Sequence, residues 1–163
     1  MPKEKNEVHT IGHSNHQLSD FLKLIHDNGI EMVVDVRSSP YSKYSPQFNK
    51  KPLEKSLKEV NIEYIYLGNK IGGKPRENKF YHENKVLYHL VEKDQKYQDG
   101  IELLNALLNG NQLVLMCSEE NPLHCHRHKL IGSTILQRGC KVRHIRGDGR
   151  VEEADPAVQT TLF

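Results

Sequence analysis

Reactive side chains are concentrated between Cys117 and His128. This stretch holds two thiols, three imidazoles, two carboxylates and a guanidinium, and it follows four apolar residues that begin at Leu113. The apolar run predicts a buried strand, and the polar residues then occupy the turn into a helix expected over residues 124–137. Ligands of open α/β sheets bind at such turns, where the first amides of a helix also favour an anion. We therefore expect a reactive or binding centre here.

Cys117 is the candidate nucleophile, because a thiol near cations and a helix N-terminus has a lowered pKa. His126 or His13 is a candidate base, and Arg127 is a candidate ligand for an anionic part of a substrate. Glu119 completes the predicted catalytic group. The alternative interpretation is that Cys117 is a small core residue at the end of a strand, since free cysteines are usually buried and inert.

A metal centre is a second interpretation of the same residues. Cys117, Cys125 and one or two of the nearby histidines (His124, His126, His128) offer ligands for a tetrahedral ion. The spacing does not match a CxxC pair, however, and adjacent residues on a helix cannot all face one ion. The sequence therefore predicts no cofactor, with zinc on Cys117, Cys125 and His126 as the disfavoured alternative.

Length and composition favour one soluble globular domain. The chain has 163 residues, of which 36% are hydrophobic and 27% charged. A chain of this length can form a stable hydrophobic core without disulfide bonds or structural metal ions. The N-terminus lacks the apolar segment of a signal peptide, and no apolar run could span a bilayer, so we expect a cytoplasmic protein with no membrane partner. The net charge of +2 permits binding to nucleic acid without arguing for it.

Strand and helix patterns alternate along the chain. This predicts a single three-layer, Rossmann-like α/β domain over residues 8–146, with helices on both faces of a mostly parallel five-stranded sheet and tails at 1–7 and 147–163. A strand order of 3-2-1-4-5 is expected. The predicted strands are 8–12, 30–36, 62–67, 112–116 and 141–145, and the predicted helices are 18–28, 51–60, 97–108 and 124–137, with a weakly helical excursion at 77–95.

This order brings three strand ends to one edge of the sheet. His13 and Ser14 follow the first strand, Asp35 and Arg37 close the second, and Tyr41 lies in the loop beyond. Asp35 is expected to orient a ribose or a catalytic base, and the other four to bind substrate. The alternative is a salt bridge between Asp35 and Arg37 that ties the second strand to its loop.

A pair of glycines, Gly72 and Gly73, lies among the basic residues Lys70, Lys74 and Arg76. Such a loop can wrap a phosphate, but the sequence matches neither glycine-rich fingerprint, so a mobile solvated loop is the preferred interpretation.

Several motifs together resemble the family called domain of unknown function 488, over about residues 8–146. They are Thr10-Ile-Gly-His-Ser14, Asp35-Val-Arg37 with Pro40 and Phe48, Gly72-Gly73, and Cys117-Ser-Glu119 followed by Cys125-His-Arg127. The resemblance implies a compact α/β domain with a shared site at these positions, and it implies no reaction. Asp-Val-Arg and a cysteine that ends a strand also look like rhodanese and cysteine-phosphatase domains. Those folds place an arginine closer to the cysteine, so this likeness is an analogy.

The last residues form a possible docking peptide. Gln159, Leu162 and Phe163 resemble the short motif by which bacterial replication and repair enzymes bind the sliding clamp. Two apolar anchors would fill a pocket while the glutamine fixes the register. This interpretation implies a DNA substrate and a role in DNA repair. The alternative is that Leu162 and Phe163 pack on the domain's own core.

The residues thus favour an enzyme that acts on a phosphate-bearing substrate, a nucleotide or nucleic acid, by a reaction that the sequence does not assign. The alternatives are a non-catalytic nucleic-acid or nucleotide binding module and a small metal-binding domain.

Overall fold

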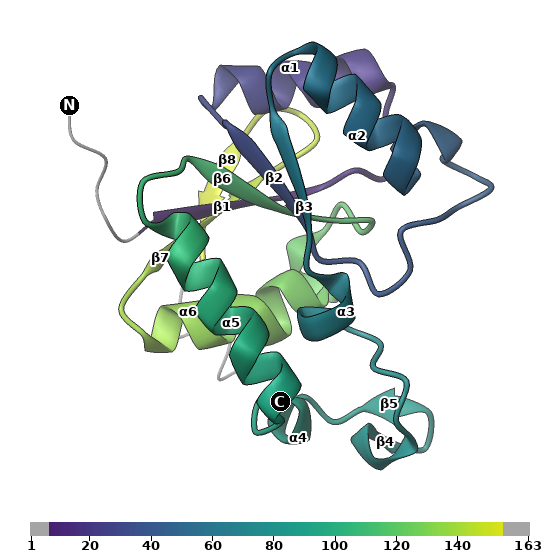
Figure 1. Cartoon of the computed structure of the whole chain (residues 1–163), viewed down its shortest axis with the longest axis vertical. Helices are drawn as coiled ribbons and strands as arrows, with labels where there is room; N and C mark the ends of the chain where they lie inside the picture. The colour runs from purple at the N-terminus through teal and green to yellow at the C-terminus, as the bar shows by residue number, and fades with distance from the viewer. Residues whose placement is uncertain (1–6, 155–163) are drawn as a thin grey trace.

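The computed structural model describes residues 7–154, which contain one central sheet of six strands in the order β3-β2-β6-β1-β7-β8 (Figure 1). Neighbouring strands are parallel except for the antiparallel pair of β7 and β8. The predicted α/β class with a mostly parallel sheet is confirmed. The strands are β1 (Glu7–Gly12), β2 (Met32–Asp35), β3 (Glu63–Tyr66), β6 (Leu113–Cys117), β7 (Lys141–Ile145) and β8 (Val151–Glu153).

The predicted strand count and order are wrong in two details. β6, the predicted fourth strand, lies between β2 and β1 instead of beyond β1. Its five residues are all buried, which suits a central strand covered on both faces. β8 is an additional edge strand whose Val-Glu-Glu sequence has no apolar alternation, so no pattern marks it. The end of β6 therefore has a strand end on either side of it.

Helices cover both faces of the sheet and complete three layers (Figure 1). α1 (Leu18–Asp27) and α2 (Lys50–Glu59) bury residues such as Phe21 and Leu57 against one face. α5 (Gln95–Leu108) and α6 (Ser133–Gln137) pack on the other, with Ile101 and Ile135 in its core. Alternation along β6 divides its side chains between the two cores. Even-numbered residues face α1 and α2, whereas odd-numbered ones, Cys117 included, face α5 and α6.

The segment after β6 is not the single helix that the sequence predicts over 124–137. A 3₁₀ turn, η3 (Pro122–His124), comes first, Cys125 has extended backbone, and a π-helical turn, η4 (Arg127–Gly132), leads into α6. Asn121 caps η3 by accepting a hydrogen bond from the Leu123 amide at 3.1 Å. Single π-helical turns are rare and often occur at functional sites.

The excursion between β3 and α5 forms small elements away from the main sheet (Figure 1). β4 (Tyr81–His82) and β5 (Lys85–Val86) make an antiparallel hairpin. The same excursion contains α3 (Gly68–Ile71), η2 (Asn78–Phe80) and α4 (Tyr88–Val91), whereas η1 (Pro46–Phe48) lies between β2 and α2. Within residues 7–154 we find no helix with the length and apolar character needed to cross a membrane.

Leu115→Ala tests the central position of β6. Leu115 is fully buried in the middle of this strand, so its truncation should lower the free energy of unfolding by about 2–5 kcal/mol. Leu103→Ala is the matched control, because Leu103 on α5 is 47% exposed and its loss should change stability by less than about 0.5 kcal/mol. Urea unfolding measures both, and equal losses would contradict the assignment of β6 to the core.

Candidate functional site

A pocket of about 730 Å³ opens at the carboxyl ends of β2 and β6. The loop after β2 leads to α2 on one face of the sheet, and the loop after β6 leads to α6 on the other. The two loops therefore diverge and leave a crevice, as at the switch points of other open α/β sheets. Cys117, Glu119 and His126 line the pocket together with Arg37 and Tyr41. Five of the predicted catalytic and substrate-binding residues thus share one pocket, and Cys125 of the alternative metal group lines it as well.

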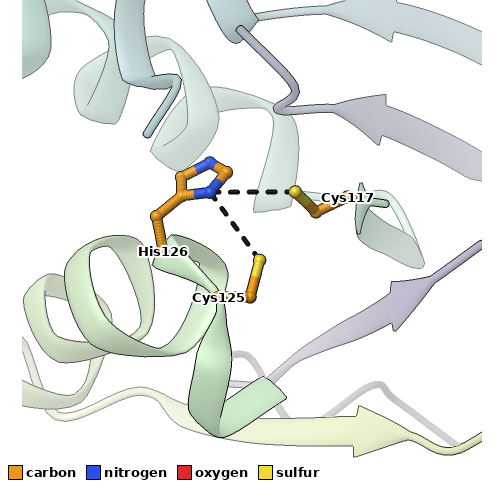
Figure 2. A group of neighbouring side chains, drawn as sticks. All are labelled: Cys117, Cys125 and His126. Atoms are coloured by element: carbon orange, nitrogen blue, oxygen red, sulfur yellow. Dashed lines mark hydrogen bonds between the residues drawn. The ribbon is translucent and has the colours of Figure 1, made fainter. Parts of the chain in front are cut away.

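Two thiols and an imidazole meet at the base of this pocket (Figure 2). The Nδ1 atom of His126 lies 3.7 Å from the sulfur of Cys117 and 3.7 Å from the sulfur of Cys125. The Nε2 atom of the same ring donates a hydrogen bond to the carbonyl of Val36 at 2.9 Å. The ring proton is therefore on Nε2, and the lone pair of Nδ1 faces both sulfurs.

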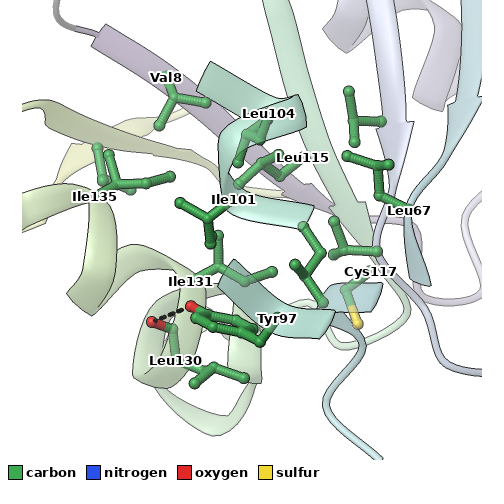
Figure 3. Close-up of a cluster of buried hydrophobic side chains, with 14 of the residues drawn as sticks. Val8, Leu67, Tyr97, Ile101, Leu104, Leu115, Cys117, Leu130, Ile131 and Ile135 are labelled. Carbon is green, nitrogen blue, oxygen red and sulfur yellow. Dashed lines mark hydrogen bonds between the residues drawn. The ribbon is translucent and has the colours of Figure 1, made fainter. Parts of the chain in front are cut away.

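Cys117 lies at the margin of the hydrophobic core beneath α5 (Figure 3). A hydrogen bond from Cys125 lowers the pKa of the Cys117 thiol to about 7 against the effect of burial, and the backbone amides of Ser118 and Glu119 and the charge of Arg127 contribute. The same pairing with Cys117, followed by burial, raises the pKa of Cys125 to about 12. Cys117 is thus the thiol that ionises first.

The glycine pair is packed against this cluster. A Cβ atom on Gly73 would lie 2.6 Å from Cγ of His126, and one on Gly72 would lie 2.3 Å from the hydroxyl of Ser38. Both glycines are buried. Ser38 also accepts a hydrogen bond from the amide of Lys74 at 2.8 Å. The absence of side chains at Gly72 and Gly73 therefore brings the basic loop onto the imidazole.

Cations and tyrosines form the outer wall of the pocket. Lys50, Lys74 and Arg76 line it, and within residues 7–154 none of them forms an ion pair with a carboxylate. The tyrosine rings belong to Tyr41, Tyr66 and Tyr88. Among the described residues that line the pocket, the one carboxylate is Glu119. This wall suits an anion that carries a planar group.

The predicted residues Asp35 and Arg37 form a buried ion pair. Nε of Arg37 donates to Oδ1 of Asp35 at 2.9 Å, and Nη2 donates to Oδ2 at 2.8 Å. Nη2 also donates to the carbonyl of Phe48, and the Tyr64 hydroxyl donates to Asp35 at 2.5 Å. Asp35 has no exposed surface and faces α1 and α2, on the side of the sheet opposite Cys117. The salt bridge proposed as an alternative is present, and of the two residues only Arg37 lines the pocket.

His13 belongs to the same network. Its Nε2 atom accepts a hydrogen bond from Arg37 at 3.2 Å, and its Nδ1 atom donates to the carbonyl of Ser14 at 2.7 Å. Its ring is stacked on Phe48. Burial lowers the pKa of His13 to about 4, so the ring is neutral. Neither His13 nor Ser14 lines the pocket.

Arg127 is fully buried behind the pocket. Its guanidinium donates to the carbonyls of Glu119 and Glu120 and to the hydroxyl of Thr10. The loop that it holds crosses the end of β1 so closely that a Cβ atom on Gly12 would lie 1.9 Å from the Glu119 carbonyl. Arg127 therefore does not line the pocket. It supports the loop whose backbone amides, those of Ser118 and Glu119, lie beside the sulfur of Cys117.

The family model described as "Domain of unknown function DUF488" matches residues 17–133. The chain belongs to this family. Its description names no activity, and neither the curated proteins nor the solved structures gave a match. The resemblance seen in the motifs is confirmed. Apart from Thr10, Gly12, His13 and Ser14, the matched residues of this DUF488 domain include all the site residues discussed above.

The sequence alone identifies some of the further pocket residues of this DUF488 domain and misses others. Lys74 and Arg76 are marked by the basic loop around the glycine pair. Lys50, Tyr66 and Tyr88 come from three separate elements, and no local pattern marks them. The predicted docking residues Gln159, Leu162 and Phe163 lie outside the described residues.

The neutral, buried His13 predicts a pH-dependent stability. Its pKa falls from 6.5 to about 4 on folding, so the unfolded chain binds more protons between these values. The stabilisation is complete above pH 6.5, and about 3 kcal/mol should be lost as the pH falls towards 4. Urea unfolding across this range should show a shallower pH dependence for His13→Gln, which keeps one donor and one acceptor.

His26→Gln is the control for this measurement, because His26 lies on the exposed surface of α1. It should retain the pH dependence of the unaltered protein. If His13→Gln retained it as well, the burial of a neutral imidazole at this position would be contradicted.

Proposed function

We propose that the protein is an enzyme that acts on a phosphate-bearing substrate, a nucleotide or nucleic acid, bound in the pocket between β2 and β6. One observation carries the proposal. The same pocket joins cations that have no carboxylate partner within residues 7–154, tyrosine rings and the group formed by Cys117, Glu119 and His126.

The cations define the charge of the substrate. Lys50, Lys74 and Arg76 line an open pocket in which Glu119 is the one carboxylate among the described lining residues. Lys50 also lies 4.8 Å from the centre of the Tyr66 ring, which places a cation beside an aromatic face. Phosphate takes charge-assisted hydrogen bonds from such groups, and a base can stack on a tyrosine. The volume of about 730 Å³ is in the range of small-molecule sites.

The residues at the base of the pocket favour an enzyme over a binding module. Binding a phosphate requires the cations and the tyrosines alone. A thiol–imidazole cluster held at 3.7 Å in a buried site adds nothing to affinity for an anion, whereas such groups are typical of reactive centres. Glu119 is exposed in the same pocket and can accept or donate a proton.

Binding is tested with pyrophosphate, the nucleoside mono-, di- and triphosphates and a short single-stranded DNA, by isothermal titration calorimetry. At least one nucleotide or the DNA should bind in competition with pyrophosphate. Joint replacement of Lys74→Ala and Arg76→Ala should weaken binding by about tenfold or more, since each removes a charged hydrogen bond.

The control removes the same charge elsewhere. Lys23→Ala with Arg150→Ala replaces two exposed cations that are paired with Asp27 and Asp148, outside the pocket. Affinity should stay unchanged in this variant. Equal losses in both double variants, or no binding of any compound, would overturn the proposed substrate class.

Turnover of the compounds that bind is followed by mass spectrometry. Glu119→Gln should reduce the rate by about 100-fold or more if Glu119 transfers a proton, with unchanged or stronger affinity for pyrophosphate. Binding without turnover of any compound by the unaltered protein would favour the non-catalytic binding module.

The C-terminal peptide adds a proposal about recruitment, which rests on its sequence alone. Leu162 and Phe163 would anchor the chain in the apolar pocket of a bacterial sliding clamp, with Gln159 fixing the register. Joint replacement of Leu162→Ala and Phe163→Ala should then weaken clamp binding by roughly 30-fold or more in surface plasmon resonance, because buried aromatic anchors dominate such contacts. Thr161→Ala, between Gln159 and the two anchors, is the control. Equal clamp binding by all three proteins, or none by the unaltered chain, would refute recruitment.

A further inference from the structure

We propose that Cys117, Cys125 and His126 bind one Zn²⁺ ion, with the fourth ligand position open to the pocket. The ligand atoms would be the two sulfurs and Nδ1 of the imidazole. Metal binding by these residues is independent of the function proposed above, whereas the role that we assign to the ion deepens that function and rests on it.

The separation of each sulfur from the imidazole nitrogen matches that of neighbouring ligands in a tetrahedral zinc site. Their ligand atoms all lie within 4.8 Å of one another, and each sulfur lies 3.7 Å from Nδ1. Zinc–sulfur and zinc–nitrogen bonds of ordinary length at tetrahedral angles place neighbouring ligand atoms roughly 3.5–3.8 Å apart. An ion therefore needs little movement of the side chains.

The imidazole is held in the form that a metal requires. Its Nε2–H group donates to the carbonyl of Val36 at 2.9 Å, which leaves the lone pair of Nδ1 directed at the sulfurs (Figure 2). Histidines that ligate metals usually donate their other N–H group to a carbonyl or carboxylate in this way. The ring of His126 also packs against Gly73, so its orientation is fixed from a second side.

The position of Nδ1 between the two sulfurs also suits a cation. The single lone pair of Nδ1 faces two thiols at equal distance, but it can accept a hydrogen bond from only one of them at a time. A central ion would engage all three ligand atoms together. Two thiolates and one imidazole in a tetrahedral arrangement select zinc among common divalent ions.

The local backbone removes the objection raised by the sequence. Cys125 and His126 are adjacent, and neighbouring residues of a helix point in different directions. Cys125 is not helical, however, because its φ of −131° and ψ of 146° are those of extended chain between η3 and η4. Its side chain can therefore turn towards the same point as that of His126, and Cys117 approaches from the end of β6.

The open fourth position gives the ion a role in the proposed reaction. Zinc with three protein ligands binds water and makes it acidic near neutral pH. Such a water would pass one proton to the carboxylate of Glu119 and leave hydroxide on the metal. The hydroxide would attack the substrate held by the pocket cations, and Glu119 would return the proton to the leaving group. The reaction class is then hydrolysis.

The metal site is tested on the full chain, freed of metal by a chelator and kept under reductant. Titration with Zn²⁺ against a chromophoric chelator should show one tight equivalent. Co²⁺ should give the intense visible bands of a tetrahedral ion and a thiolate charge-transfer band in the near ultraviolet. Cys117→Ser, Cys125→Ser and His126→Gln should each lower zinc affinity by about 100-fold or more, since even residues that only support a ligand have effects of 10–100-fold.

Two controls separate ligands from neighbours. Cys140→Ser replaces the remaining cysteine, and His124→Gln replaces an imidazole that lines the same pocket outside the cluster. Both should bind zinc as the unaltered chain does. A cobalt spectrum of the unaltered chain without a charge-transfer band, or full affinity in Cys117→Ser, would overturn the proposal. The spectrum needs no variant, so a variant that fails to fold leaves the test intact.

Failure of the metal site and failure of the proposed function can be told apart. Pyrophosphate binding is measured on the metal-free chain and depends on Lys74 and Arg76, while zinc binding is measured without substrate. Turnover that survives removal of the metal would refute the role of the ion and leave the substrate class standing. Zinc binding without any phosphate binding would refute the substrate class, and with it the role of the ion, and would leave the metal site standing.

Discussion

The hydrogen bond from Nε2 of His126 to the carbonyl of Val36 joins the turn after β6 to the end of β2, which are 90 residues apart in the chain. It closes the base of the pocket and fixes the tautomer of the ring. It also directs Nδ1 to the two sulfurs, so both of the chemistries considered for this cluster depend on it. The central position of β6 makes this bond possible, because a strand order with β1 between β2 and β6 would separate the two ends.

The opposite face of the sheet carries a buried ion pair that positions the loop after β2. The ion pair of Asp35 and Arg37 is buried, and removing two charges from water costs about as much as their attraction returns. Its stabilising effect is therefore a weak reason for its presence. Its geometry is a stronger reason, because the guanidinium also binds the carbonyl of Phe48 and the ring of His13. These contacts fix the side of the loop after β2 that faces away from the pocket. The other side of the loop forms part of the pocket wall.

Local patterns predicted the elements of the fold, and they failed where the answer depended on pairing between distant segments. Periodicity located the main strands and helices, because burial on one face leaves a repeat in the sequence. The order of the strands depends on which apolar strand takes the centre, and the five-residue β6 gives no local sign of this. The sequence predicts the cluster at Cys117 as reactive, but it also predicts a helix through Cys125, where the backbone is extended. Lys50 and Tyr66 belong to separate elements, and no local sequence pattern marks them as pocket residues.

The two chemistries assign opposite roles to Cys117. A thiolate that attacks a substrate must be free, whereas a thiolate that holds zinc is occupied by the ion. Loss of Cys117 would abolish either reaction, so that residue cannot distinguish them. Cys125 can, because a nucleophilic Cys117 needs its neighbour only as a hydrogen-bond donor, which Cys125→Ser retains, while a metal needs both sulfurs equally. The distances from Nδ1 to the two sulfurs are equal, as expected if both sulfurs bind one ion. The geometry therefore favours a bound ion over a free nucleophile at Cys117.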